Sequence, residues 1–283
     1  MKSMKKSKRF NNGLVYTILI VLSVIWILPI LWIIMISFRA EQGAFKPYFF
    51  PKALSLDNYI RLFSDTQQFY FFRWFLNTLF VAICSCIIST FFTLSVSYVM
   101  SRLRFRLRKP FMNIALILGM FPGFMSMIAI YYILKGFGIS QSLLALILVY
   151  SGASGLGFYI AKGFFDTLPR ALDEAAYLDG ATKSQVFWKI TIPLSKPIII
   201  YTVLTTFIAP WMEYIFASVI MGDHYDNYTV ALGLFKMLER EFIHQYFTQF
   251  AAGAVIISIP ISILFISMQR FYVEGVTGGS VKG

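Results

Sequence analysis

Long apolar runs are the feature that most strongly limits how this chain can fold. The first extends from Phe10 to Phe38 without a charged residue, whereas a helix needs only about 20 apolar residues to cross a bilayer. Five further, mostly apolar runs follow: Trp74–Ser101, Phe111–Leu134, Ser142–Phe164, Ile198–Met221 and Phe250–Phe271. Since backbone polar groups in lipid must be hydrogen-bonded within the protein, the runs predict an all-α polytopic membrane protein with six transmembrane helices.

The distribution of charge supports this class and argues against a nucleic-acid-binding protein. Only 13% of the 283 residues are charged, against about 25% in soluble domains. The net charge is +12, but the Lys and Arg residues stand in clusters between the apolar runs and do not follow one face. We therefore interpret the clusters as markers of membrane topology, with the lipid bilayer and no nucleic acid as a partner.

The same clusters give the orientation in the membrane. Seventeen of the 25 Lys and Arg residues fall in the N-terminus, in the loops after the second and fourth runs, and in the tail, and eight fall in the alternate segments. The positive-inside rule then predicts that both termini are cytoplasmic. The first run exceeds the 7–15-residue core of a signal peptide and contains no small-residue cleavage site, so we expect an uncleaved span.

The apolar runs divide the chain into three parts. Residues 1–73 hold the first span and an outer loop, residues 74–272 form the membrane core, and residues 273–283 form a cytoplasmic tail. In the outer loop, one face of a short surface helix is formed by Leu56, Tyr59, Ile60 and Phe63. Because glycine costs about 1 kcal/mol per helical position relative to alanine, the glycines of the tail predict a segment too flexible to hold a helix.

Two of the predicted spans contain residues that interrupt or shape a helix. Pro122 and Gly123 lie inside the third span and predict a kink or a local unwinding there. In the fourth span, Ser151 and Gly155 are small residues four positions apart. We interpret them first as a close helix–helix packing face and second as part of a substrate path.

Residues 166–197 are a polar stretch on the predicted cytoplasmic side. Pro169 suits the first turn of a helix, with Asp166 or Thr167 as a possible N-cap. One apolar stripe of that helix would be formed by Leu168, Ala171, Leu172, Ala175 and Ala176. Gly180 is placed to end the helix in a left-handed turn.

A second short helix should follow this turn. Thr182 and Gln185 have the spacing of a capping box, and the helix they begin would run to Pro193. The small alanines of the first helix would let the backbone of another protein come close, and carboxylates offered to basic groups of that protein are Asp173, Glu174 and Asp179. An ordinary amphipathic loop helix is the alternative interpretation.

The spacing within this stretch resembles the EAA loop of ABC importer permeases. The matching residues are Glu174, Ala175, Ala176, Gly180, Ile190 and Pro193. One position departs from the pattern, since Ile192 stands where the loop has Leu, which changes little in side-chain volume. The resemblance implies that these residues, with Asp179, contact a separate ATPase and couple it to transport.

Over nearly its whole length the chain resembles the MalG-type permease subunits of maltose and maltodextrin ABC importers. Further segments that carry the resemblance are residues 101–105 (SRLRF), 119–122 (GMFP), 228–233 (YTVALG), 250–255 (FAAGAV) and 275–283 (GVTGGSVKG). The resemblance implies the type I importer permease fold in the inner or cytoplasmic membrane of a bacterium. It also implies that the chain passes a maltodextrin-like oligosaccharide inward by alternating access.

The resemblance implies a set of partners as well. These are a MalF-type second permease subunit, a homodimeric cytoplasmic ATPase and an extracytoplasmic sugar-binding protein. The ATPase would contact the tail through Gly278, Gly279 and Lys282. The binding protein would contact the outer loop 222–249 at Glu239, Arg240, Glu241 and His244, although this tip departs from the family in sequence.

The sequence contains no G-x-x-x-x-G-K-[ST] phosphate-binding loop, so we expect ATP and Mg to be bound by the partner ATPase and not by this chain. No pattern of catalytic or metal-ligating residues is found. Cys84 and Cys86 lie two apart in one apolar run and point to different sides of a helix, so we do not expect them to pair. We expect no cofactor in this chain and interpret it as a transport subunit, not as an enzyme.

Glu213 is the one acidic residue inside a predicted span. Burial of such a charge at mid-membrane costs about 2.5–3.5 kcal/mol, so the side chain should face a cavity or a partner helix, or lie close enough to the outer interface to be hydrated. We place Pro122, Gly155 and Glu213 on a candidate translocation path. Two alternatives to a maltodextrin importer are a permease for another oligosaccharide, of raffinose or multiple-sugar type, and a membrane-embedded enzyme or channel.

Overall fold

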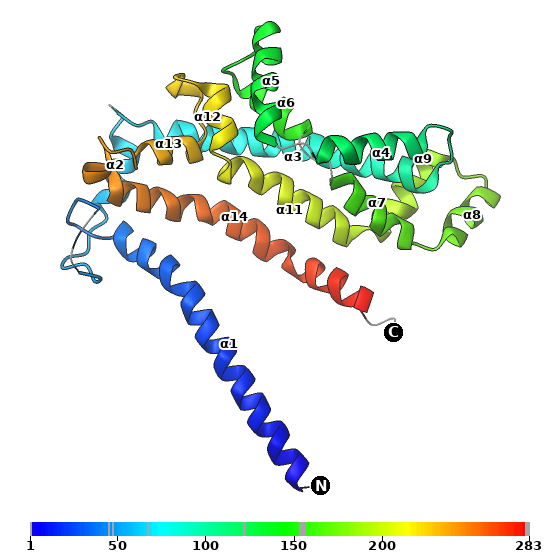
Figure 1. Ribbon diagram of the computed structural model, residues 1–283, viewed down its shortest axis with the longest axis horizontal. Helices are drawn as coiled ribbons and strands as arrows, with labels where there is room; N and C mark the ends of the chain where they lie inside the picture. Colours follow the sequence, from blue (N-terminus) through cyan, green and yellow to red (C-terminus); the bar gives the residue numbers. More distant parts are fainter. Residues whose placement is uncertain are drawn as a thin grey trace. The chain divides into compact units, whose positions relative to one another are not determined.

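A computed structural model describes residues 2–44, 46, 48–66, 68–120, 123–152 and 157–280, with side chains described from residue 12 to 269 apart from Phe124. Within these residues the regular secondary structure is helical (Figure 1), which agrees with the all-α prediction. Three helices are long and apolar enough to cross a membrane: α1 (Lys2–Ser37), α3 (Phe71–Arg102) and α14 (Ile243–Ser280). Two bent helix pairs bring the number of candidate spans to as many as five.

The third and fourth apolar runs each form two helices. The third contains α4 (Arg108–Gly119) and α5 (Gly123–Gly136), so the interruption expected at Pro122 and Gly123 falls between them, and Pro122 itself lies outside the described residues. The fourth contains α6 (Leu143–Gly152) and α7 (Gly157–Thr167), which are bent by 42° relative to each other. Gly155 lies outside the described residues, so its packing role stays a prediction.

The fifth run is also broken, at a position that the sequence did not predict. α11 (Lys196–Met212) ends before Glu213, and α12 (Ile215–Met221) begins two residues later. Pro210 lies in the last turn of α11 and removes a backbone donor there. The single span predicted over Ile198–Met221 is therefore two helices with Glu213 at their junction.

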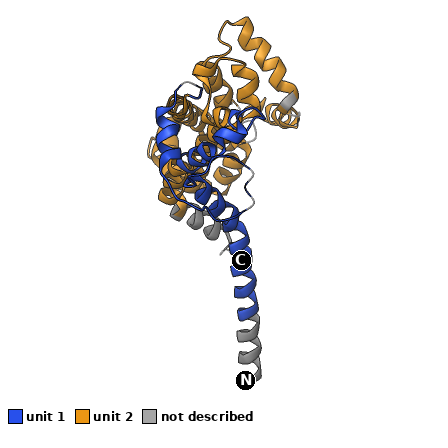
Figure 2. Ribbon diagram, turned by 90° about the vertical axis from the view of Figure 1, so that its left-hand side faces the viewer, with its two compact units in different colours: residues 1–69, 236–256 blue, residues 70–235, 257–283 orange. Residues whose placement is uncertain are grey.

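The chain divides into two compact units, which Figure 2 colours separately. The first comprises residues 1–69 and 236–256. In it, α2 (Asp57–Ser64) is attached to the end of α1, because Asn58 donates from Nδ2 to the carbonyls of Ser37 at 3.0 Å and Arg39 at 2.7 Å. The predicted surface helix is thus confirmed, and its apolar Leu56, Ile60 and Phe63 are exposed.

The second unit comprises residues 70–235 and 257–283, and α3 is the helix around which it packs. α6, α7 and α11 all contact α3, and α11 runs beside it in Figure 1. The face of α3 toward these neighbours carries a hydroxyl side chain at every fourth position, all buried: Ser85, Ser89, Thr93, Ser97 and Ser101. Small side chains of this kind allow close approach of helices in a membrane protein.

The N-terminal end of α3 is held by the segment that follows α12. η2 (Tyr225–Asn227) and α13 (Val230–Lys236) lie against it. Trp74 donates from Nε1 to the carbonyl of Tyr225 at 2.7 Å, and the amide of Val230 donates to Oγ1 of Thr78 at 2.7 Å. A Cβ added to Gly233 would lie 1.9 Å from the Trp74 ring. Residues 228–233 (YTVALG) therefore serve the packing of α3.

The expectation of a tail too flexible for a helix is wrong for most of its length. α14 continues through Gly278 and Gly279 to Ser280, and Lys282 lies outside the described residues. Extending an existing helix adds a hydrogen bond per residue without a new nucleation step. The helix that begins at Ile243 therefore carries its backbone through the glycines.

Candidate functional site

The polar stretch 166–197 folds into two short helices joined at a fixed corner. α8 (Arg170–Leu178) ends at Asp179, and Gly180 has φ +84°. The amide of Gly180 donates to the carbonyl of Tyr177 at 3.1 Å, and the amide of Ala181 donates to the carbonyl of Ala176 at 2.9 Å. These two bonds form a Schellman motif, so the predicted left-handed glycine turn is confirmed.

The second helix begins as the sequence predicted. α9 (Lys183–Val186) has Thr182 as its N-cap, whose Oγ1 accepts from the amide of Gln185 at 3.3 Å. In return, Oε1 of Gln185 accepts from the amide of Thr182 at 2.7 Å. Both halves of the capping box are present, which fixes the direction of α9 after the corner.

The first helix, by contrast, is not capped as predicted. Its N-cap is Pro169, and no side chain caps the helix. Asp166 instead accepts from Ser101 at 2.6 Å and pairs with Lys162 at 2.5 Å, while Oγ1 of Thr167 donates to the carbonyl of Phe164. Asp166 therefore ties α7 to the end of α3, which accounts for the failed prediction.

α8 is attached to the rest of the unit by a buried ion pair. Nε of Arg102, the last residue of α3, lies 3.2 Å from Oδ2 of Asp173, and the two side chains are 4% and 10% exposed. Arg102 also donates to the carbonyl of Leu168 at 3.0 Å. Asp173 is the one buried residue of α8. The interpretation of Asp173 as an acceptor for a partner's basic groups is therefore wrong, because its carboxylate is already paired within the chain.

α9 and the residues after it are anchored on the same end of α3. Oη of Tyr98 donates to the carbonyl of Lys183 at 3.1 Å. The core beneath the two helices is formed by Leu94, Tyr98, Ala161, Phe165, Phe187 and Ile198. Residues from α3, α7, α11 and the polar stretch thus share one core.

A π-helical turn, which the sequence analysis missed, connects α9 to α11. It spans Phe187–Thr191 and is followed by α10 (Ile192–Leu194), with Ile190 half-buried and Pro193 exposed. Pro193 has no backbone amide to donate and displaces the α-helical pattern before it. π turns often occur at functional positions, and here one contains the matching Ile190.

The outward side of the corner is left uncovered by the chain. Glu174, Ala175, Asp179 and Gly180 are exposed, and Ala176 is half-buried. Large apolar side chains beside them are also exposed, Leu178 at 89% and Trp188 at 53%. A polar segment that exposes such groups on a rigid frame has the properties of a protein-binding surface. We call these residues, 174–180 with Trp188, the corner surface.

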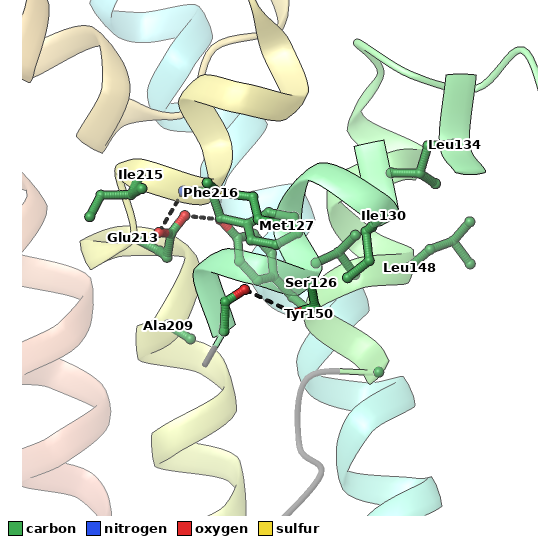
Figure 3. A pocket seen from close by; sticks show the side chains of 13 residues that line it. Ser126, Met127, Ile130, Leu134, Leu148, Tyr150, Ala209, Glu213, Ile215 and Phe216 are labelled. Carbon is green, nitrogen blue, oxygen red and sulfur yellow. Dashed lines mark hydrogen bonds between the residues drawn. The ribbon is translucent and has the colours of Figure 1, made fainter. Parts of the chain in front are cut away.

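A second candidate site is a cavity of about 820 Å³ in the same unit (Figure 3). Its walls come from α5, α6 and the junction of α11 with α12, and they are mostly apolar, with Met127, Ile130, Leu148 and Phe216 among them. The volume lies within the range of pockets that hold small molecules. Among the lining residues with polar side chains are Ser126, Tyr150 and Glu213.

Glu213 lines this cavity and also closes the break between α11 and α12. Its carboxylate accepts from the backbone amides of Phe216 at 2.8 Å and Ala217 at 2.9 Å, and from Oη of Tyr150 at 3.2 Å. The cavity interpretation of Glu213 therefore agrees with its position. The two bonds from α12 and the one from Tyr150 of α6 explain how an acidic residue is held in an apolar run, because they replace hydration with three donors.

The outer-loop residues predicted to contact a binding protein are close together in the chain's first unit. Arg240, Glu241 and His244 are exposed, and half-buried Glu239 pairs with Lys236 at 2.7 Å. Contact with a binding protein stays a prediction. Within the described residues, no three His, Cys, Asp or Glu side chains are placed to hold a metal ion.

Comparison with known proteins gives consistent matches. The model of the family described as "Binding-protein-dependent transport system inner membrane component" matches residues 93–278. The galactooligosaccharides transport system permease protein GanQ of Bacillus subtilis is 32% identical over 95% of this chain and 94% of its own. The maltodextrin transport system permease protein MalD of Streptococcus pneumoniae is 32% identical over 99% of both chains.

A solved structure has the same fold. A chain in the crystal structure of a bacterial ABC transporter involved in the import of the acidic polysaccharide alginate superposes with a TM-score of 0.78. The match covers 94% of this chain and 98% of that chain at 22% sequence identity. The chain therefore has the fold of that transporter chain.

Proposed function

Because the chain belongs to the family of binding-protein-dependent transport system inner membrane components, we propose that it is the permease subunit of an ATP-driven importer of maltodextrin-like oligosaccharides. The sugar assignment rests on relatives named for maltodextrin that match nearly the full length of the chain. The proposed arrangement has six spans with cytoplasmic termini, in agreement with the distribution of Lys and Arg.

The observation that carries the mechanism is the corner surface. It is exposed and held by the Schellman turn, and the chain on either side of it, at Leu168 and Phe187, packs in one core with α3, α7 and α11. In our proposal a separate homodimeric ATPase, which binds ATP and Mg, contacts this surface. Closure of the ATPase then moves the corner, and the helices move with it as a nearly rigid body, which changes the side of the membrane on which the path opens.

The remaining partners follow from the same proposal. A second, MalF-type permease subunit would complete the translocation path, of which this chain contributes the cavity around Glu213. An extracytoplasmic binding protein would deliver the sugar and contact Glu239, Arg240, Glu241 and His244. The tail from Gly278 onward would lie against the ATPase. The chain itself carries no reaction step.

A galactooligosaccharide is the second candidate substrate, because GanQ matches the chain at the same identity as the maltodextrin permease MalD. Uptake by the reconstituted complex with its binding protein should be measured for maltotriose, a β-galactotriose and raffinose. We expect the highest uptake for maltotriose. Preferential uptake of the galactotriose or of raffinose would replace the substrate in the proposal and leave the importer assignment in place.

Coupling is tested by reversing one charge on the corner surface. Glu174→Lys should abolish the stimulation of ATP hydrolysis by sugar-loaded binding protein, because it places a cation where the ATPase is expected to offer basic groups. Lys135→Glu reverses another exposed charge, at the end of α5 and outside the polar stretch, and serves as the control. Full stimulation in the Glu174→Lys complex would show that the corner surface is not the coupling site.

A further inference from the structure

A second cavity, of about 600 Å³, lies beside the loop that joins α3 to α4. Basic side chains dominate its lining, namely Arg104, Arg106, Arg108, Lys109 and Lys162. Phe105, Pro110 and Met112 complete it. The clustering of these cations around one hollow goes beyond what the positive-inside rule needs, since that rule concerns the number of Lys and Arg residues and not their convergence.

Most of the charge in this basic cavity is uncompensated. Lys162 pairs with Asp166, but in the part of the chain that the structure describes, Arg104, Arg106, Arg108 and Lys109 have no carboxylate within ion-pair distance. Like charges that share a hollow of this size repel one another, and an anion bound between them would reduce that repulsion.

The start of α4 adds to the positive electrostatic potential of this cavity. Its first turn contains Arg108 and Lys109 and no acidic residue, and its N-cap, Leu107, supplies no side-chain acceptor. Cations at a helix N-terminus meet the positive end of the helix dipole, which favours anions by about 0.3–1 kcal/mol each. The positive end of α4 therefore adds to the attraction that the basic side chains exert on an anion.

The surroundings of the cavity identify the kind of anion. The cavity follows directly on the membrane-spanning α3, and α4 buries none of its residues against the chain. Phe105, Leu107 and Phe111 beside the cations are 42%, 66% and 51% exposed. Exposed apolar side chains next to a cluster of Lys and Arg are typical of the boundary between lipid headgroups and acyl chains.

The opposite wall of the cavity is fixed in place. Oη of Tyr159 in α7 donates to the carbonyl of Met112 in α4, and Lys162 follows one turn later on α7. The cavity is therefore formed between two helices and is not a feature of the loop alone. We propose that it binds the phosphodiester headgroup of an anionic phospholipid in the cytoplasmic leaflet, with the acyl chains against α4.

The test measures lipid binding to the purified, complete transporter and needs neither sugar nor ATP hydrolysis, so its result is independent of the proposed substrate. Short-chain phosphatidylglycerol is titrated against the complex in phosphatidylcholine nanodiscs. The Arg106→Gln/Lys109→Gln variant removes two cavity cations. Each basic residue at an anionic surface contributes about fivefold in affinity, so we expect the Kd to rise about 25-fold.

The matched control is Lys183→Gln/Lys189→Gln, which removes two exposed cations on the same predicted side but outside the cavity. Its Kd should change less than twofold. An unchanged Kd in the cavity variant would overturn the proposal. Displacement of the lipid by 10 mM inorganic phosphate would identify a soluble anion as the ligand. Loss of the ATPase from the cavity variant, with unchanged lipid affinity, would identify a protein contact. Either result would also overturn the proposal.

Discussion

Arg102 and Asp173 form a buried ion pair that fixes the first helix of the polar stretch to the end of α3. Their charged atoms are 3.2 Å apart, and the side chains are 4% and 10% exposed. The two residues lie on different sides of α4 to α7 in sequence. A buried pair of this kind contributes little net stability, but removal of one member leaves an uncompensated charge. The pair therefore fixes the position of α8 more than it stabilises the fold.

Asp173→Asn should detach α8, because the Arg102 guanidinium then remains buried without its counter-ion. Breaking such a pair costs about 3–5 kcal/mol, and we expect faster proteolysis within 166–181 and weaker co-purification of the ATPase. Asp226→Asn is the control, since Asp226 pairs with Arg73 at 54% and 61% exposure and such pairs contribute about 0–1 kcal/mol. Equal proteolysis of the two variants would contradict the role given to the buried pair.

Gly233→Ala should destabilise the packing of η2 and α13 against the N-terminal end of α3. The added Cβ would lie 1.9 Å from the Trp74 ring, and the indole cannot retreat without losing its bond to the Tyr225 carbonyl. Overpacking of this kind costs about 1–3 kcal/mol. The thermal midpoint of the purified subunit pair should fall. Gly163→Ala, in α7 with open space around the added Cβ, should leave the midpoint unchanged, and equal midpoints for both variants would refute the packing argument.

Glu213→Ala should loosen the start of α12. The carboxylate accepts from the amides of Phe216 and Ala217, and loss of a capping acceptor costs about 0.5–2 kcal/mol. Hydrogen exchange at these two amides should therefore accelerate about tenfold, because 1.4 kcal/mol corresponds to a factor of ten. Tyr150→Phe removes one donor to Glu213 and keeps both amide bonds, so its exchange should stay near that of the wild type. Unchanged exchange in Glu213→Ala would show that the carboxylate does not hold the break.

Much of the polar stretch could be predicted from the sequence because its signals are local. The left-handed turn at Gly180 and the capping box of Thr182 and Gln185 each depend on residues within five positions of one another. Asp166 and Asp173 were assigned wrongly for the opposite reason. Their partners, Ser101 and Arg102, lie more than 60 residues earlier, and no local rule connects them.

The membrane helices show the same division. Hydropathy identifies apolar runs, but it does not register a break at Glu213, where a single side chain supplies acceptors for the next helix. One signal was present and overlooked. The hydroxyl residues from Ser85 to Ser101 recur at every fourth position, which marks the face of α3 on which α7 and α11 pack.

The orientation in the membrane can be measured with single cysteines in a background without Cys84 and Cys86. We expect a cysteine at Ser184 to be protected from an impermeant thiol reagent in intact cells and one at Asp223 to react, because the Lys and Arg distribution places Ser184 in the cytoplasm. Both positions are exposed, so burial within the chain does not confuse the result. Permeabilised cells, in which both should react, provide the control, and the reverse pattern in intact cells would invert the topology.

The last prediction concerns Gly180, whose φ of +84° few side chains adopt. Within this chain, open space surrounds an added Cβ there, so the reason we expect an effect of Gly180→Val is backbone strain and not crowding inside the subunit. A β-branched residue in this region costs about 1–2 kcal/mol or more, or it straightens the corner. We expect the variant to insert and to associate with the second permease, but to lose the stimulation of ATP hydrolysis by sugar-loaded binding protein.

Gly180→Asn separates the backbone effect from the mere presence of a side chain. Asparagine adopts positive φ more readily than valine does. This variant should therefore keep most of the stimulation, although the asparagine side chain has one heavy atom more than the valine side chain. The order expected for stimulated hydrolysis is therefore glycine, then asparagine, then valine. If valine and asparagine reduce it equally, the corner responds to bulk at an interface; if neither reduces it, the left-handed turn is not needed for coupling.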